Sequence, residues 1–236
     1  MVIFLTGLAA SMAHVVTGPD HLAAVTPLAI DSRKKSWMVG FSWGLGHTLG
    51  MLLIGCVFLL FRRFISIDRI AQHSDLIVGF LLVGIGSWAI VRTYLRHRHV
   101  HRPHAHFHTT PHLYAHIHSH SHSEHDGHEH AHEKASNQNA LTALLIGILH
   151  GFSGFSHLIA LLPSLALPTF TASLIYIIAF ATGTILVMVL FAFVLGFVAF
   201  QSFIKEKQIF LKWFTFSGGA LAIVVGVIWI FKGILL

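Results

Sequence analysis

The feature that most constrains this chain is a polar motif that occurs twice inside long apolar segments. His14 and His21 are separated by six residues, and so are His150 and His157. In both copies a glycine follows the first histidine by four residues, and Leu-x-Ala-x-x-Pro follows the second histidine. The matching positions are 136 residues apart (150 − 14). This constant offset predicts an internal duplication that carries a pair of histidines at membrane depth.

The composition predicts a membrane protein. Hydrophobic residues make up 55% of the 236 residues and charged residues only 10%, whereas soluble domains carry about 25% charged residues. Six apolar segments are long enough to cross a bilayer, which takes about 20 residues, and a helix satisfies its own backbone in lipid. The sequence therefore predicts an all-α, polytopic membrane protein. Its six transmembrane helices are expected over residues 1–30, 37–61, 76–95, 140–167, 173–200 and 210–235.

A polar linker at residues 97–139 divides these helices into membrane repeat 1, residues 1–96, and membrane repeat 2, residues 140–236. Because each repeat has three spans, two homologous halves must insert in opposite directions, as the inverted repeats of transporters do. We expect the first helix of each repeat to be broken. An unbroken helix would hold His14 and His21 about 10 Å apart along its axis, too far to share an ion. Gly18-Pro19 supplies the break, since proline suits the first turn of a new helix.

The loop charges predict an orientation. Most lysines and arginines lie at residues 33–35, 92–102 and 205–212, which share one side of the predicted topology. The positive-inside rule makes that side cytoplasmic. We therefore expect a multi-pass protein of the bacterial inner membrane, with a cytoplasmic linker and both termini outside. The first segment is expected to remain as a membrane helix rather than be cleaved as a secretory signal. Its second copy lies inside the chain, and no basic stretch precedes the first segment.

The linker contains fifteen of the twenty-one histidines. It has few apolar residues, so we expect it to be disordered. Dense imidazoles bind late first-row divalent ions such as nickel, copper, zinc and cobalt. The linker is therefore predicted to be a metal reservoir or sensor. A solvated tract that responds to pH is the alternative, because histidine titrates near neutral pH.

Ionisable side chains within membrane helices are costly and mark ligand or ion pathways. The alternative is a histidine that only bonds a neighbouring helix. Asp20 could ligate an ion directly or orient a ligand histidine, and a mixed imidazole and carboxylate set suits nickel, cobalt, zinc or copper better than magnesium or calcium. The candidate metal ligands are His14, Asp20, His21, His47, His150 and His157.

These residues resemble the nickel/cobalt transporter family, including its branch of urease-accessory membrane proteins. The resemblance rests on His14, the pair Asp20-His21 and the tetrad Leu45-Gly46-His47-Thr48. It implies that these polar side chains line a metal route. Two departures from the family pattern favour the urease-accessory branch. Five residues separate His14 from Asp20, where the family usually has four, and the His150–His157 copy stands in place of the later acidic motif of the permeases.

The sequence thus predicts a transporter of a divalent transition metal, nickel or cobalt first, with zinc and copper as alternatives. No organic cofactor is expected, and the expected partners are the lipid bilayer, the metal ion and a cytoplasmic metallochaperone, with no nucleic acid. The chain lacks the nucleophile elbow, phosphate-binding loop and zinc-protease motif of enzymes, so we expect no catalysed reaction. One alternative is a membrane metallochaperone or assembly factor for a nickel or copper enzyme that moves no metal. Another is a proton- or thiol-coupled carrier of a different solute, whose thiol form the single Cys56 disfavours.

Overall fold

The computed structural model describes residues 1–61, 67–96, 129–153, 155–205 and 207–235. Regular structure in these residues is entirely helical. The helices are α1 (Val2–Thr17), α2 (Pro19–Ser32), the short 3₁₀ helix η1 (Arg33–Lys35), α3 (Ser36–Phe61), α4 (Ile67–Arg96), α5 (Glu129–Ser153), α6 (Phe155–Leu165), α7 (Phe170–Ile204) and α8 (Gln208–Leu235).

Four stretches of the described chain are long and apolar enough to cross a membrane, which confirms a polytopic, all-helical membrane protein. These stretches are Pro19–Val57, Asp75–Leu95, Phe170–Ile204 and Ile209–Leu235. Val2–Thr17 and Asn139–Phe152 are apolar but shorter. The six spans and their inverted arrangement stay a prediction, because the segments 1–30 and 140–167 are each divided into two helices.

The predicted break of the first helix is confirmed. α1 ends at Thr17, α2 begins at Pro19, and Gly18 between them has an extended backbone with φ −89° and ψ 97°. Proline at the first helical position needs no amide hydrogen, and the carboxylate of Asp20 suits the positive end of the helix dipole. In the second copy α5 ends at Ser153 and α6 begins at Phe155. Residue 154 between them lies outside the described residues.

Helix α5 begins inside the segment that the sequence predicted to be a disordered linker. Its first residue is Glu129, so residues 129–139 are helical and the prediction is wrong for them. Alanine, glutamate and lysine in this segment favour a helix, and the apolar residues that follow continue it. Residues 97–128, with most of the linker histidines, lie outside the described residues.

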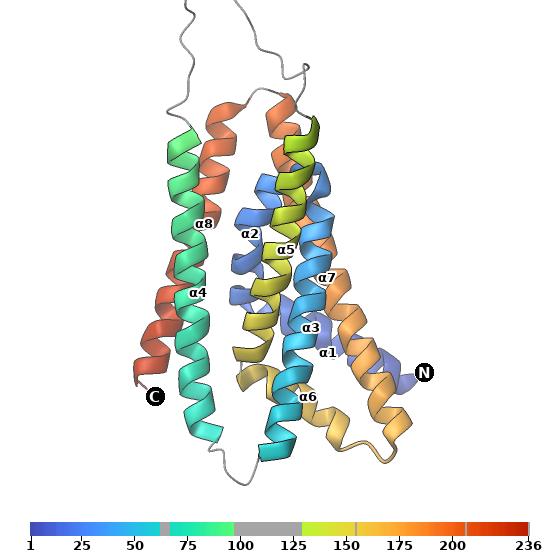
Figure 1. The fold of residues 1–236 in the computed structure, drawn as a ribbon. Coiled ribbons are helices and arrows are strands. Elements are labelled where there is room, and N and C mark those ends of the chain that lie inside the picture. Colours follow the sequence, from blue (N-terminus) through green and yellow to red (C-terminus); the bar gives the residue numbers. More distant parts are fainter. Residues whose placement is uncertain (62–66, 97–128, 154, 206, 236) are drawn as a thin grey trace, which may run out of the picture.

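Helix α2 is the most enclosed element and lies at the centre of the molecule (Figure 1). Helices α4 and α8 pack along each other on one side of α2, and α3 packs against both α5 and α7 on the other. Helix α1 packs along α7. Glycines bring the backbones together at these crossings: Gly46 of α3 faces the carbonyl of Leu144, and Gly183 of α7 faces the carbonyl of Leu8.

Candidate metal centre

Four imidazole rings and one carboxylate gather around the break between α1 and α2. Asp20, His21, His47 and His150 are buried, with exposed fractions of 6%, 2%, 0% and 0%, and His14 is half-buried. These side chains come from four helices: α1 and α2 at the break, α3, and the C-terminal turn of α5. Because a buried polar group is costly without partners, the contacts within this cluster determine what it can bind.

The helix break brings the first histidine pair together. The amide of Gly18 donates to the carbonyl of His14 at 3.1 Å and closes α1, while the amide of His21 donates to the carbonyl of Gly18 at 3.2 Å. The two rings then meet edge to face, with 3.1 Å between their Nε2 atoms. The break therefore replaces the separation of about 10 Å expected from a continuous helix with direct contact.

Asp20 links the two halves of the chain. Its Oδ1 accepts a hydrogen bond from Nδ1 of His21 at 2.9 Å, and its Oδ2 lies 3.3 Å from Nε2 of His150. A carboxylate that accepts from a histidine ring fixes the tautomer and leaves the other ring nitrogen available to a metal. For His21, that other nitrogen is Nε2, which lies 3.1 Å from Nε2 of His14.

His47 enters the cluster because α3 and α5 approach closely. A Cβ atom added at Gly151 would meet the backbone of His47, and one added at Gly147 would meet its amide nitrogen at 3.0 Å. Small residues at such crossings let membrane helices touch. The ring centroid of His47 consequently lies 5.0 Å from that of His21 and 5.6 Å from that of His150.

Trp43 forms one wall of the cluster, and it was not among the residues predicted from the sequence. Its ring stacks on His47 with 4.8 Å between centroids and 9° between planes. It also lies 5.6 Å from His21 and 5.5 Å from His150. Its one sequence signal is its position one helical turn before His47, on the same face.

Two sets of three ligand atoms within the cluster could hold a metal ion. One set is His14, His21 and His47, and the other is Asp20, His21 and His150, with all ligand atoms of a set within 4.8 Å of one another. Imidazole nitrogen with or without one carboxylate is the donor chemistry of nickel, cobalt, zinc and copper. The structure thus brings together five of the six predicted ligands, and metal binding by them remains a prediction. The side chain of the sixth, His157, lies outside the described residues.

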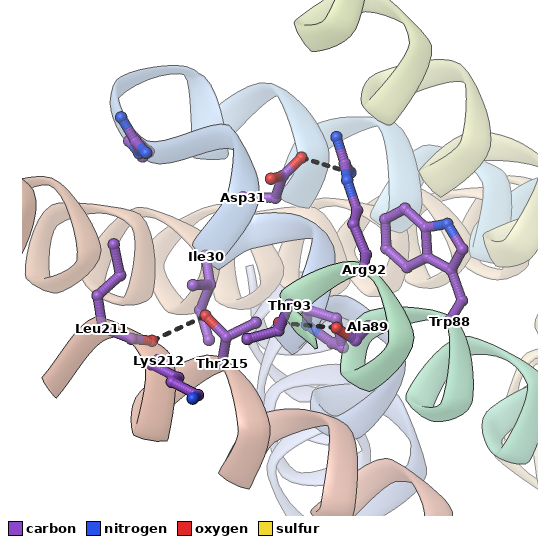
Figure 2. Close-up of a pocket in the computed structure, with 11 residues that line it drawn as sticks. Ile30, Asp31, Trp88, Ala89, Arg92, Thr93, Leu211, Lys212 and Thr215 are labelled. Atoms are coloured by element: carbon purple, nitrogen blue, oxygen red, sulfur yellow. Dashed lines mark hydrogen bonds and ion pairs between the residues drawn. The ribbon is translucent and has the colours of Figure 1, made fainter. Parts of the chain in front are cut away.

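A second polar feature lies at the other end of α2, about three turns from His21. A cavity of about 220 Å³ lies there. Asp31 of α2 and Arg92 of α4, which line it, form an ion pair with 2.8 Å between Oδ2 and Nη1, and Figure 2 shows this pair among the lining residues. Asn139 of α5 donates to the same carboxylate at 3.0 Å and to the hydroxyl of Ser32 at 3.0 Å. Asp31 therefore ties the helix that carries Asp20 and His21 to two of its neighbours.

Replacement of Asp31 should destabilise the bundle. In Asp31→Ala, Arg92 and Asn139 lose a shared acceptor in a partly buried place, and we expect a loss of about 1–3 kcal/mol in the free energy of unfolding. Asp75→Ala is the matched control, because Asp75 pairs with the more exposed Lys232 and such pairs contribute at most about 1 kcal/mol. Unfolding in detergent micelles measures both. Equal losses would contradict the bridging role of Asp31.

Comparison with known proteins identifies three relatives. The chain is 29% identical over 205 residues to Chloroplast protein FOR GROWTH AND FERTILITY 2 of Arabidopsis thaliana, which covers 86% of this chain and 48% of that protein. It is 42% identical over 86 residues to Chloroplast protein FOR GROWTH AND FERTILITY 1 of the same plant, covering 36% of this chain and 24% of that one. It is 28% identical over 181 residues to Urease accessory protein UreH of Bacillus sp. (strain TB-90), covering 75% of this chain and 69% of that protein.

These similarities confirm that the chain is related to a urease accessory protein, while the particular branch stays a prediction, because the plant proteins are related too. The chain spans about half the length of the first chloroplast relative and about a quarter of the second. No family model matches the chain, and no solved structure matches it. The bacterial relative is described as an accessory protein of urease, and the absence of a catalysed reaction in this chain stays a prediction.

Proposed function

We propose that this protein transports a divalent transition metal, nickel or cobalt, across a membrane through the cluster of His14, Asp20, His21, His47 and His150. The observation that carries the proposal is the convergence of four imidazoles and one carboxylate inside an apolar helical bundle. Ionisable groups at that depth are rare unless they serve a pathway. The relationship to a urease accessory protein supports nickel as the first candidate metal.

The proposal includes six spans in two inverted repeats, and matched contacts support it. The close approach of Gly183 to the carbonyl of Leu8 has a counterpart in Gly46 and the carbonyl of Leu144, at the offset of the duplicated motif (144 − 8 = 136). Likewise Phe180 lies 5.8 Å from His14, and Trp43 lies 5.5 Å from His150. Contacts repeated in this way are expected of two related halves that face each other across a central site.

The same arrangement suggests which parts move. Helices α4 and α8 form one tightly packed pair, with Gly79 facing the carbonyl of Gly226 and Gly226 facing the carbonyl of Gly79. Asp31 of α2 binds both Arg92 of this pair and Asn139 of α5, so this network links the pair to α2 and α5. In the proposed cycle the α4–α8 pair rocks against the other helices around α2, and breaking this network opens one end. We place that end, where the basic η1 lies, at the cytoplasm.

Sealed proteoliposomes test the transport. We expect vesicles that contain the protein and an internal fluorescent chelator to accumulate Co²⁺ or Ni²⁺ well beyond one ion per protein molecule. The competing function is an assembly factor that holds metal without moving it, which the name of the bacterial relative favours. Uptake that stops at the amount bound by the protein, with no signal from the internal chelator, would establish that second function and exclude transport.

A further inference from the structure

We propose that the cluster contains two successive ion positions on opposite edges of the His21 ring, occupied one at a time. The outer position is formed by His14, His21 and His47, and the inner position by Asp20, His21 and His150. This inference rests on the proposed transport function and deepens it, because it assigns a route to the ion within the cluster.

The two nitrogens of His21 face different partners. Its Nε2 lies 3.1 Å from Nε2 of His14, and its Nδ1 lies 2.9 Å from Oδ1 of Asp20. An ion bound at about 2.0–2.1 Å from each nitrogen needs its ligand atoms roughly 3–4 Å apart, so small side-chain movements close either set. An ion held at one edge of the ring is out of reach of the nitrogen at the other edge.

His21 can serve only one position at a time. A neutral imidazole has one nitrogen with a free lone pair and one that carries a hydrogen. With the ion in the outer position, Nδ1–H donates to Asp20. With the ion in the inner position, Nε2–H faces His14. Transfer of the ion therefore moves one proton from Nδ1 to Nε2, with water as the carrier, and His21 is neutral before and after.

Burial and charge set the order of the two positions. The outer set contains His14, the half-buried member of the cluster, whereas every member of the inner set is buried. The outer set has no formal charge, while the inner set has the carboxylate of Asp20, whose attraction for a divalent cation is strong in a medium of low dielectric constant. We infer that an ion enters at the outer position and rests at the inner one until the helices move.

Cobalt spectroscopy on the full chain tests this order, with Co²⁺ as the probe. A variant with all five cluster side chains replaced gives the contribution of the linker histidines, which is subtracted. In the intact protein, X-ray absorption should show carboxylate oxygen and imidazole nitrogen around the first equivalent of Co²⁺. Asp20→Asn combined with His150→Ala should leave only nitrogen ligands from the protein and weaken binding about 10-fold to 100-fold.

His14→Ala combined with His47→Ala is the complementary variant. It should retain the carboxylate among the cobalt ligands, while the association rate falls at least about 10-fold. The milder single variants Asp20→Asn and His47→Gln repeat both tests if a double variant unfolds. Two ions bound at once above the linker background, or identical cobalt spectra in all variants, would overturn the two positions. Those outcomes leave vesicle uptake unaffected, so they are distinct from a failure of transport.

Discussion

His21→Ala should abolish specific metal binding and transport. His21 belongs to both sets of ligand atoms, so its removal leaves two protein ligands in either position. Changes to groups that only support a ligand cost about 10-fold to 100-fold in metal affinity, and we expect the loss of this ligand to cost at least about 100-fold. Titration calorimetry with Ni²⁺ or Co²⁺, corrected for the linker, measures affinity, and initial uptake into proteoliposomes measures transport.

The matched control for this prediction is His73→Ala. His73 is an exposed histidine on α4 and has no place in the cluster, so its removal should leave membrane-site affinity and uptake unchanged. His21→Gln provides a second variant, because glutamine fills more of the buried space than alanine. A His21 variant that folds normally and still transports metal at the full rate would refute the assignment of the site.

The break in the first helix could be predicted because its causes are local. Gly18-Pro19 interrupts any continuous helix through His14 and His21, and the two rings can touch only if that helix stops between them. The structure places the break between Thr17 and Pro19. The position of Asp20 could be predicted for the same reason, because a carboxylate in the first turn of a helix is a local sequence signal.

The membership of His47 and His150 could be predicted from the duplication, but their contacts could not. The bond between Asp20 and His150 joins residues 130 positions apart (150 − 20), and it depends on how α2 and α5 pack. Trp43 was missed because an apolar membrane helix contains many aromatic residues, and only the tertiary structure shows which one faces the imidazoles. Its counterpart Phe180 lies beside His14, a pairing that the offset in the sequence alone does not reveal.

The two repeats supply different groups to the site. Thr184 occupies the position in α7 that His47 occupies in α3 (184 − 47 = 137), and it is fully buried. The first half therefore brings three imidazoles and a carboxylate, and the second brings one described imidazole. Such asymmetry is expected when the two halves diverge after a duplication. One ion needs only three or four ligands, so the second half can lose ligands while the cluster still binds an ion.

Gly18→Ala should weaken metal binding at least about 10-fold, since it displaces a ligand and its orienting carboxylate. The backbone at Gly18 has a φ of −89°, which alanine adopts readily, so conformation is not the obstacle. The obstacle is space. An added methyl group would collide with Nδ1 of His21, would lie 2.7 Å from its Cε1, and would meet Oδ1 of Asp20 at 3.0 Å. Either the His21 ring or the first turn of α2 must move.

Gly84→Ala is the control that separates this crowding from a general effect of replacing glycine. Gly84 lies within α4 beside a hollow of about 380 Å³, and a Cβ atom there meets nothing within 4 Å. Alanine in a helix interior is more stable than glycine by roughly 0.5–1 kcal/mol. This variant should therefore unfold at a slightly higher denaturant concentration and bind Co²⁺ with unchanged affinity. If Gly18→Ala also bound Co²⁺ with unchanged affinity, the contact between Gly18 and His21 would not set the ligand geometry. The extended residue at the break would then serve only to turn the chain.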